Sequence, residues 1–376
     1  MSQNRLSKLR RSTDNEMRIA LTILILTSAA VAASAQRSLP PLATLEGWVQ
    51  AGDSLDAEIQ FQLALRYEAA RRYDDAERAL RIAIAADPRS SPSWMWLGDL
   101  PYLRDKKLAK QEERHDVPPD RVSTVDSAKR FRVRAFTLDP FGQDFATYFD
   151  ERYDLSFFEL DLYLTHQYGK TPLDSVPSEL LFYHGLTATQ MGRYDKAASD
   201  FQVLVKRGAQ MEQPDTVLRV PLNANAYRYV LAIVKERSNK PVDAIQLYHD
   251  IITHDLGFYM AYAHLSQLYR QYKMWDSATV EAQAAVEANP DDPWLLVDLG
   301  AIERDSGHLP DAATTLQKAV ALDPRFPEAY YRLGVVLQEL HRVDDARAAL
   351  THFVAVAPTR LETEIIDAKK RLDSLH

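Results

Sequence analysis

Two consecutive segments decide the fold, and they read PWLLVDLGAIERDSGHLPDAATTLQKAVALDP (residues 293–324) and PEAYYRLGVVLQELHRVDDARAALTHFVAVAP (residues 327–358). Equivalent residues in the two segments are 34 positions apart, and the same period relates small residues and prolines further towards the N-terminus. The residues that recur are Ala244, Ala278, Ala312 and Ala346; Pro290, Pro324 and Pro358; and Ala232, Ser266, Gly300 and Gly334. A fixed period of this length predicts an array of small units that bury their apolar faces against one another.

Each segment contains two apolar stretches with helical spacing, separated by a polar turn such as Asp305-Ser306-Gly307-His308. A proline closes the segment and should end the second helix, because its ring clashes with the preceding turn. Small residues at the eighth position, such as Gly300, and at the twentieth, such as Ala312, would let the two helices approach closely. The pattern therefore predicts one helix pair in each unit.

These segments resemble the tetratricopeptide repeat, in which an aromatic residue or Leu stands at the fourth position and Leu at the seventh. A small residue follows at the eighth, Ala at the twentieth and Pro at the thirty-second position, as in both segments quoted above. The resemblance implies an all-α fold, a right-handed superhelical solenoid of antiparallel helix pairs. In the same register it extends over nearly all of residues 57–360.

The repeat register divides the chain into a series of regions. The expected regions are a signal peptide or retained anchor (residues 1–35), a linker (36–56), N-terminal repeat units with an insertion at 104–119 (57–140), a degenerate aromatic-rich helical unit (141–177), a repeat unit (178–211), an insertion (212–224), four consecutive repeat units (225–360) and a capping helix (361–376). We expect the insertion at 104–119 to be an exposed loop or a short helix. The last region places its apolar residues on one helical stripe, which would cover the end of the stack.

The first 35 residues have the features of a secretory signal. Basic residues lead into an apolar run at residues 19–33, and Ala33-Ser34-Ala35 precedes Gln36 as a small-residue cleavage site. The run is shorter than the roughly 20 residues that cross a bilayer as a helix, which favours cleavage over a retained anchor. Either alternative exports the remainder of the chain, so we expect it in the periplasm or extracytoplasmic envelope.

Without residues 1–35 the chain carries 40 Lys and Arg against 51 Asp and Glu, so the exported part is acidic. This balance argues against a nucleic-acid partner, which needs a basic surface. We expect the partners to be proteins, namely a peptide, a helix or the subunits of a complex. Association with a membrane would then occur through such a partner or through an uncleaved N-terminal segment.

The resemblance also implies where a partner would bind. In this family the first helices of successive units line a concave groove that commonly holds a segment of another protein, at the second, fifth, ninth and twelfth positions of each unit. The expected groove residues are Tyr229, Ile233, Met260, Gln267, Arg270, Trp294, Val297, Arg304, Tyr331 and Val335. Aromatic residues and Arg dominate binding at protein interfaces, at about 2 kcal/mol or more each. The alternative for a single aromatic residue is that it packs against a neighbouring helix.

Aromatic residues are also concentrated between residues 141 and 168. A docking patch there would use Phe145, Tyr148, Phe149, Tyr153, Phe157 and Phe158. Partly wetted aromatic rings suit a protein or membrane interface. The alternative is a degenerate repeat whose rings fill a wide gap between neighbouring units, and its position within the array favours this second interpretation.

Composition and motifs give little support for catalysis. The 376 residues include no Cys and only 12 Gly, which excludes disulfides and thiolate sites and disfavours phosphate-binding loops. There is no nucleophile elbow, P-loop or dinucleotide-binding motif, and His249 and His254 have the wrong spacing for one metal-binding face. We therefore expect no enzymatic activity, cofactor or metal.

Three functions follow in order of preference. The first is an exported protein-interaction scaffold or assembly factor that binds a partner segment in the concave groove. The second is a permanent accessory subunit of a large envelope membrane complex (secretion, respiratory or photosynthetic), with the insertions and the aromatic segment making the contacts. An enzyme is the remote third.

Overall fold

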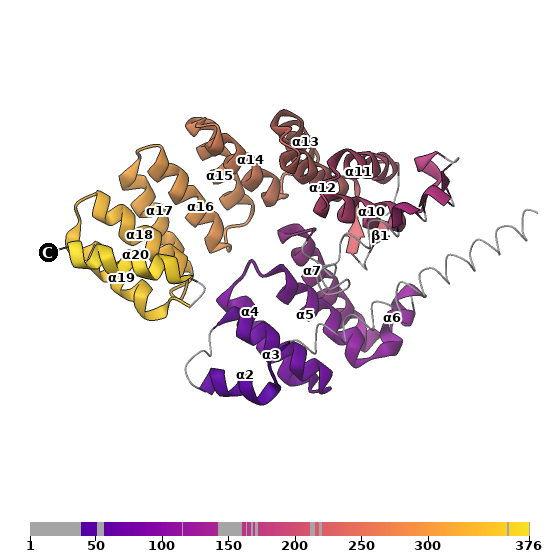
Figure 1. Ribbon diagram of the computed structural model, residues 1–376, viewed down its shortest axis with the longest axis horizontal. Helices are drawn as coiled ribbons and strands as arrows, with labels where there is room; N and C mark the ends of the chain where they lie inside the picture. Colours follow the sequence, from indigo (N-terminus) through magenta and orange to yellow (C-terminus); the bar gives the residue numbers. More distant parts are fainter. Residues whose placement is uncertain are drawn as a thin grey trace, which may run out of the picture.

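The computed structural model describes residues 39–50, 56–114, 116–141, 160–162, 164–166, 168–169, 172–210, 215–217, 220–358 and 361–375, which form a curved stack of helices (Figure 1). The expected signal segment (residues 1–35) lies outside these ranges, as does the expected docking patch of Phe145, Tyr148, Phe149, Tyr153, Phe157 and Phe158. Among the described residues, no helix combines the length and the apolar character needed to cross a membrane.

The stack has two parts, which we call the N-terminal block (residues 39–141) and the C-terminal block (residues 172–375). The N-terminal block contains α2 (Leu42–Trp48), α3 (Ala57–Ala69), α4 (Tyr73–Ala86), α5 (Ser91–Arg104), α6 (Lys106–Glu113), the 3-10 helix η2 (Pro119–Arg121) and α7 (Val122–Leu138). The C-terminal block contains η3 (Leu173–Ser175), α10 (Ser178–Gln190), α11 (Tyr194–Gly208), β1 (Asp215–Val217), β2 (Val220–Leu222), α12 (Ala224–Arg237), α13 (Pro241–His254), α14 (Tyr259–Gln271), α15 (Trp275–Ala288), α16 (Pro293–Asp305), α17 (Leu309–Leu322), α18 (Pro327–Glu339), α19 (Val343–Val356) and α20 (Glu362–Ser374). The fold is the all-α superhelical solenoid of antiparallel helix pairs that the repeat pattern predicts.

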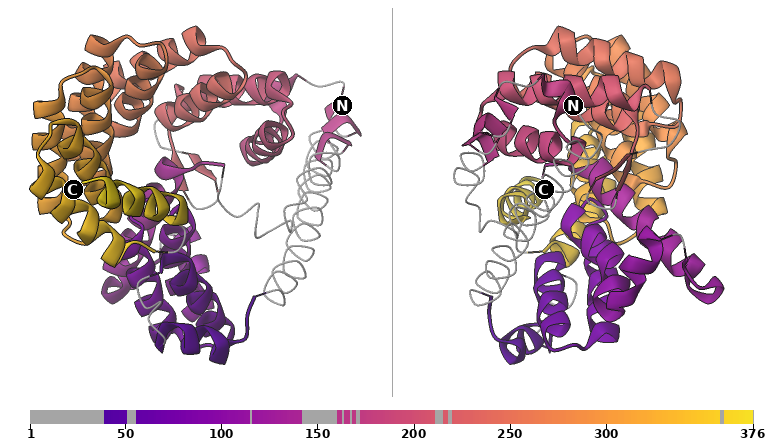
Figure 2. Two further views of the ribbon diagram at one scale, coloured as in Figure 1. Left: turned by 60° about the vertical axis from the view of Figure 1, so that its left-hand side comes forward. Right: turned by 90° about the vertical axis from the view of Figure 1, so that its right-hand side faces the viewer.

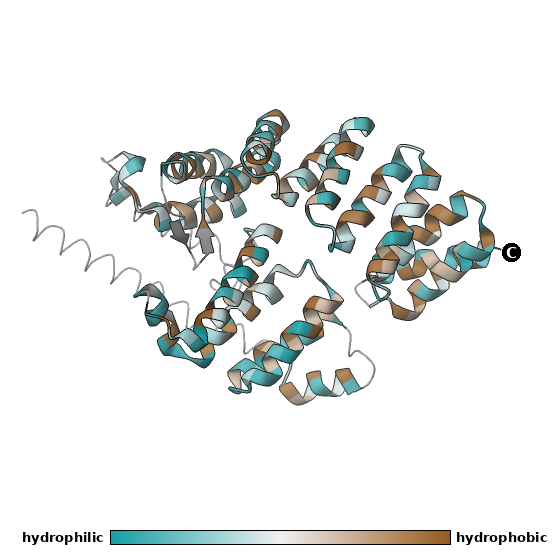
Figure 3. Ribbon diagram, turned by 180° about the vertical axis from the view of Figure 1, so that it is seen from behind, coloured by the Kyte–Doolittle hydropathy of each residue, from teal (hydrophilic) through white to brown (hydrophobic). Residues whose placement is uncertain are grey.

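Proline and small residues shape the helix pairs of the C-terminal block. Pro293 and Pro327 stand at the first position of α16 and α18, where the missing N–H costs nothing. At Gly334 an added Cβ would lie 2.6 Å from Leu350 Cγ on the partner helix. This is the close approach expected for the eighth position of the repeat. Figure 3 shows the resulting pattern of apolar and polar residues along each helix.

A left-handed residue turns the chain between the two helices of each of these pairs. It recurs every 34 residues as Asn239, Lys273, Gly307 and His341, with φ between 57° and 87°. After α16 the backbone N–H of His308 donates to Glu303 O at 2.8 Å, and that of Gly307 donates to Arg304 O at 3.0 Å. This is a Schellman motif, which satisfies the last carbonyl groups of the helix. Four different residue types hold the position, so the repeat pattern did not indicate it.

The final helix, α20, packs on the last helix pair of the stack. Leu361, Ala368 and Leu375 are buried against α18 and α19, in the same core as Leu333 and Phe353. The opposite face carries charged residues. The apolar end of the array is therefore shielded from water.

The described parts of both insertions lie against helices of the same chain. The insertion at 104–119 forms the short helix α6, in which Leu108 is buried with Val125 of α7. Tyr102 Oη of α5 also donates to Glu112 Oε2 at 2.6 Å. The insertion at 212–224 departs from the all-α pattern, because β1 and β2 pair as an antiparallel hairpin. The hairpin contacts α7, α10 and α12, so it lies where the two blocks meet.

The stack curves until the N-terminal block lies beside α14 and α16 of the C-terminal block (Figure 2). Two ion pairs join the blocks there. Arg89 Nη2 lies 3.1 Å from Asp298 Oδ2, and Arg134 Nη2 lies 2.9 Å from Asp292 Oδ2. We call this the cross-block contact. In a solenoid each unit normally touches only its neighbours, so the contact adds non-local structure to the array.

Candidate functional site

The ten expected groove residues lie on α12, α14, α16 and α18, the first helices of four successive pairs. Five of them expose 9% or less of their surface and belong to the core: Tyr229, Ile233, Met260, Val297 and Val335. The other five reach the surface in part: Gln267, Arg270, Trp294, Arg304 and Tyr331. The structure therefore does not form one open groove from these residues, and the concave face has a covered part and an open part.

The covered part lies on α12, α14 and α16, where the N-terminal block occupies the concave face. Tyr229 Oη donates to the backbone carbonyl of Thr137 in α7 at 2.9 Å. The Arg89 guanidinium lies 4.8 Å above the ring of Trp294, whose other neighbour is the edge-to-face ring of Phe326. Two of the expected anchors thus hold another segment of the same chain.

A second arginine of the N-terminal block binds on the same face. Arg134 of α7 lies 5.2 Å over the ring of Tyr259 and donates to its hydroxyl group. Its carboxylate partner, Asp292, caps the start of α16 by accepting from Trp294 N at 3.1 Å. The side chain of Asp292 is only 3% exposed, so this ion pair is shielded from solvent far more than a typical surface pair.

A polar cluster explains why Tyr229 is buried. Glu236 accepts hydrogen bonds from Tyr248 Oη and, at 3.0 Å, from His264 Nδ1, and the other ring nitrogen of His264 lies 3.2 Å from Tyr229 Oη. Burial raises the pKa of the Tyr229 hydroxyl above its usual value, so it remains a donor to Thr137 O. The cluster connects α12, α13 and α14 with α7 and has a structural role.

The expected arginine rim is used to link successive units. Arg270 Nη2 lies 2.6 Å from Asp305 Oδ2 of the next unit, and Arg304 Nη2 lies 2.5 Å from Glu339 Oε1 one unit further. These side chains are 29–40% exposed, so each pair contributes about 0–1 kcal/mol. Arg270 and Arg304 would therefore bind an acidic group of a partner only if that group replaced Asp305 or Glu339.

The open part lies on α16, α18 and α20. A cavity of about 90 Å³ is lined there by three expected groove residues, Arg304, Tyr331 and Val335, together with Arg332 and Arg371. It is the place where the structure brings predicted groove residues together around free space. Its composition, one aromatic ring and three guanidinium groups, is typical of the centre of a protein interface.

Hydrogen bonds hold the tyrosine of this cavity in place. Tyr331 Oη donates to Asp367 Oδ2 of α20 at 2.7 Å, and Arg371 Nε donates to the same oxygen at 2.5 Å. The bond from Arg371 lowers the pKa of the Asp367 carboxyl group, while burial and then Asp367 raise the pKa of Tyr331. The capping helix therefore orients the ring of Tyr331 on the concave face.

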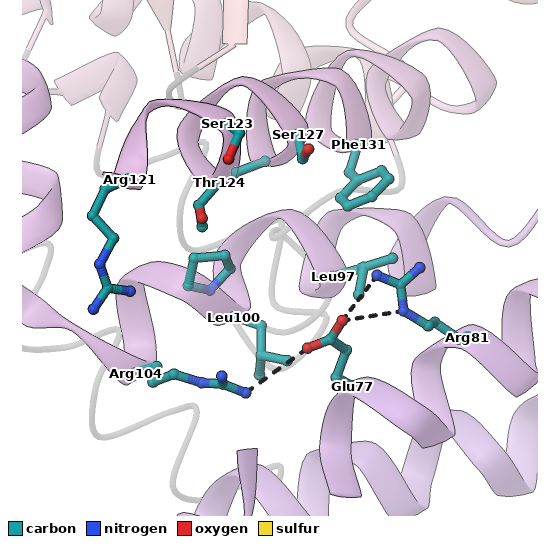
Figure 4. Close-up of a pocket in the computed structure, with 12 residues that line it drawn as sticks. Glu77, Arg81, Leu97, Leu100, Arg104, Arg121, Ser123, Thr124, Ser127 and Phe131 are labelled. Atoms are coloured by element: carbon teal, nitrogen blue, oxygen red, sulfur yellow. Dashed lines mark hydrogen bonds and ion pairs between the residues drawn. The ribbon is translucent and has the colours of Figure 1, made fainter. Parts of the chain in front are cut away.

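The sequence did not indicate a larger hollow in the N-terminal block (Figure 4). Its volume is about 350 Å³, and α4, α5, η2 and α7 contribute to its walls. Three of its residues are arginines, Arg81 of α4, Arg104 of α5 and Arg121 of η2. Only the folded chain brings them together. Within the described ranges, no group of three or more His, Asp or Glu side chains is arranged to hold a metal ion.

Comparisons with known proteins agree with this architecture. The model of the family described as "TPR repeat" matches residues 300–340, and two models described as "Tetratricopeptide repeat" match residues 61–113 and 179–207. The repeats of this superhelical protein are therefore tetratricopeptide repeats, in both blocks.

One curated relative is the probable UDP-N-acetylglucosamine–peptide N-acetylglucosaminyltransferase SPINDLY of Hordeum vulgare. It is 31% identical over 128 residues, which is 32% of this chain and 13% of that protein. A thermophilic tetratricopeptide repeat protein of Thermus thermophilus has 20% identity and a TM-score of 0.36, covering 53% of this chain and 98% of its own. The C-terminal part of a repeat protein of Cytophaga hutchinsonii has 14% identity and a TM-score of 0.46, covering 59% and 82%.

Proposed function

We propose that this protein is an exported scaffold that binds a segment of a partner protein on the open part of its concave face, between α16 and α20. Tetratricopeptide repeats support a protein-interaction scaffold in general. The observation that carries the specific proposal is the cavity at Tyr331, with Arg304 and Val335 beside it. A partner side chain inserted there would contact an oriented aromatic ring and three guanidinium groups.

The covered part of the concave face supports the same proposal. Arg89 and Arg134 of the N-terminal block are held there by aromatic rings and carboxylates, as interfaces between proteins hold such residues. The concave face thus binds arginine side chains of the N-terminal block through aromatic rings and carboxylates. The part of this face that the N-terminal block leaves open would bind side chains of a partner protein.

The binding test compares two tyrosine variants of the tagged, full-length protein. Tyr331→Ala removes the ring from the cavity, whereas Tyr272→Ala removes a half-exposed ring from the turn after α14, away from the cavity. Partners are identified by mass spectrometry after a mild-detergent pull-down, and their affinity is then measured with purified proteins. We expect Tyr331→Ala to weaken binding at least about tenfold and Tyr272→Ala to have little effect. Equal affinity of Tyr331→Ala and the wild type, with both folded, would refute the site.

Export is the second element of the proposal and rests on the N-terminal sequence alone. Mass spectrometry of the protein from its native host should find a mature N-terminus at Gln36 in the envelope fraction. An intact residue 17 in that fraction would indicate a retained anchor. Recovery of the full-length chain from the cytoplasm would overturn export.

The alternative of a permanent complex subunit depended on the insertions and the aromatic segment. The described parts of both insertions contact helices of the same chain, through Leu108 in one and through the β1–β2 hairpin in the other. They are not free arms in the described structure. A stoichiometric membrane complex in the pull-down would nevertheless favour this alternative.

A further inference from the structure

The hollow of the N-terminal block lies outside the concave-face cavity and has different chemistry. It opens between α4, α5 and α7, with Leu97, Leu100, Pro101 and Phe131 forming an apolar wall. The polar side is built by three arginines and by three hydroxyl groups of α7: Arg81, Arg104, Arg121, Ser123, Thr124 and Ser127. A volume of about 350 Å³ is within the range of small-molecule sites.

The arginines come from three elements and border one space in Figure 4. Glu77 lies 2.8 Å from Arg81 Nη2 and 3.8 Å from Arg104 Nη2. Asp74 also lies 2.7 Å from Arg104, and Asp120 lies 3.7 Å from Arg121, but both carboxylates are about 80% exposed. Exposed ion pairs of this kind contribute little to stability, so a bound anion can replace Asp74 and Asp120 as the partner of these arginines.

Arginines outnumber carboxylates by one when this hollow and its neighbour are taken together. A second hollow adjoins it through Arg104 and adds Arg71, Arg72 and Arg78 with Asp74 and Asp75. The two hollows hold six arginines, and five carboxylates line the hollows or pair with these arginines: Glu46, Asp74, Asp75, Glu77 and Asp120. The whole chain has a net charge of −8, so an excess of positive charge at one place is a local feature of the fold.

The remaining polar groups also suit an anion. Ser123 and Thr124 stand in the first turn of α7, and no side chain caps the start of that helix. These hydroxyl groups line the same space as Arg104 and Arg121 (Figure 4). Guanidinium groups combined with hydroxyl groups are a common arrangement for phosphate oxygens.

We propose that this hollow binds a phosphate monoester carried on a small apolar group. A phosphate monoester has several acceptor oxygens, which match the three guanidinium and three hydroxyl groups of this hollow better than the two oxygens of a carboxylate do. The phosphate lies between Arg121, Arg104 and the hydroxyl groups of α7. The apolar group lies against Leu97, Leu100 and Phe131.

The test titrates the full-length protein with phenyl phosphate by isothermal calorimetry, in a phosphate-free buffer at fixed ionic strength. We expect saturable binding that is tighter than that of inorganic phosphate, which lacks the apolar group, and of benzoate, which lacks the second charge. Absence of saturable binding up to about 10 mM would overturn the site. Equal binding of benzoate would overturn the choice of phosphate, and equal binding of inorganic phosphate would overturn the apolar contact.

Variants then locate the site. Arg121→Gln should weaken phenyl phosphate about tenfold or more, and Arg121→Lys should restore only part of the affinity, because Lys lacks the planar fork of donors. The matched control is Lys106→Gln, which removes an exposed charge on α6 in the same block but outside both hollows. Circular dichroism confirms that each variant is folded. Equal weakening in Arg121→Gln and Lys106→Gln would mean general charge attraction and would overturn the proposal.

Discussion

The two blocks of the molecule are built from the same helix pair but differ in charge and in the way their arginines are used. The N-terminal block (residues 39–141) carries 16 Lys and Arg against 17 Asp and Glu, whereas the C-terminal block (residues 172–375) carries 21 against 28. In the C-terminal block, Arg270 and Arg304 join successive units on the surface. In the N-terminal block, Arg132 is buried, and Arg89 and Arg134 reach across to the other block.

This difference shows that a repeated backbone does not repeat the electrostatics. The period of 34 residues concerns the small and apolar residues that set helix packing. Charged residues at other positions are free to vary, and here the C-terminal block has seven more acidic than basic residues whereas the N-terminal block has only one more. The blocks are held together by the two ion pairs of the cross-block contact and by an apolar core that Phe136 and Phe141 of the N-terminal block share with Phe182 of the C-terminal block.

The largest expected effect is that of removing the buried arginine. Arg132 is 0% exposed, donates to Asp99 Oδ1 from Nε at 2.8 Å and lies 4.4 Å over the ring of Tyr102. Arg132→Ala leaves a cavity and an unpaired carboxylate, so we expect a loss of about 3 kcal/mol in the free energy of unfolding. Arg304→Ala, at a 40% exposed arginine of the C-terminal block, should cost less than about 1 kcal/mol. Urea unfolding compares the two, and equal losses would contradict the difference between the blocks.

The next effect tests whether the blocks are held together by the cross-block contact. Arg89→Ala with Arg134→Ala removes both ion pairs, and we expect a larger radius of gyration in small-angle scattering with a loss of about 1–2 kcal/mol. The control is Arg78→Ala with Arg342→Ala, which also removes two ion pairs but none between the blocks. Arg78 pairs with Asp75 within α4, and Arg342, directly before α19, pairs with Asp345 of α19. An unchanged radius in the first variant would show that the hairpin and α7 alone set the angle between the blocks.

A smaller effect concerns a feature that both blocks share. Arg71 in the N-terminal block and His341 in the C-terminal block both have φ near +59°, a conformation that costs a residue with a Cβ about 1 kcal/mol or more. Arg71→Gly and His341→Gly should each raise the thermal midpoint, whereas Gly307→Ala should lower it. A gain at only one of the two positions would indicate that the turns are not equivalent.

The smallest effect is a pH dependence in the C-terminal block. Burial raises the pKa of Glu303, and its Oε2 atom is buried without a hydrogen-bond partner. A raised folded-state pKa means that this group's contribution to stability is present below its unfolded pKa and is lost as the pH rises through the folded value. Glu303→Gln should therefore be more stable than the wild type at neutral pH, with the gain disappearing below about pH 4. A gain independent of pH would exclude titration of Glu303 as its cause.

Much of the fold could be predicted because the deciding interactions are local. The first helices of the last two pairs begin at Pro293 and Pro327, and Gly300 and Gly334 stand where the two helices of a pair approach closely. The residues nearest to these glycines are Leu316 and Leu350, whereas the spacing indicated the small residue Ala312 opposite Gly300. The partial exposure of Tyr331 could also be predicted from the sequence, because only neighbouring units surround it. The contacts that cover Tyr229 and Trp294 could not be predicted in this way. A segment about 90 residues away in sequence covers Tyr229, and one about 200 residues away covers Trp294.

The sequence by itself determined the period, the helix pairs, the capping helix and the class of repeat, because each depends on contacts within a unit or between adjacent units. Only the tertiary structure decided which part of the concave face stays open, where Arg81, Arg104 and Arg121 meet, and that Arg89 lies on Trp294. The physical reason is that the curvature of a solenoid is the sum of small rotations between units. No single repeat encodes that sum, which brings Arg89 onto Trp294, whereas Arg81, Arg104 and Arg121 meet through the packing of the neighbouring helices α4, α5 and α7.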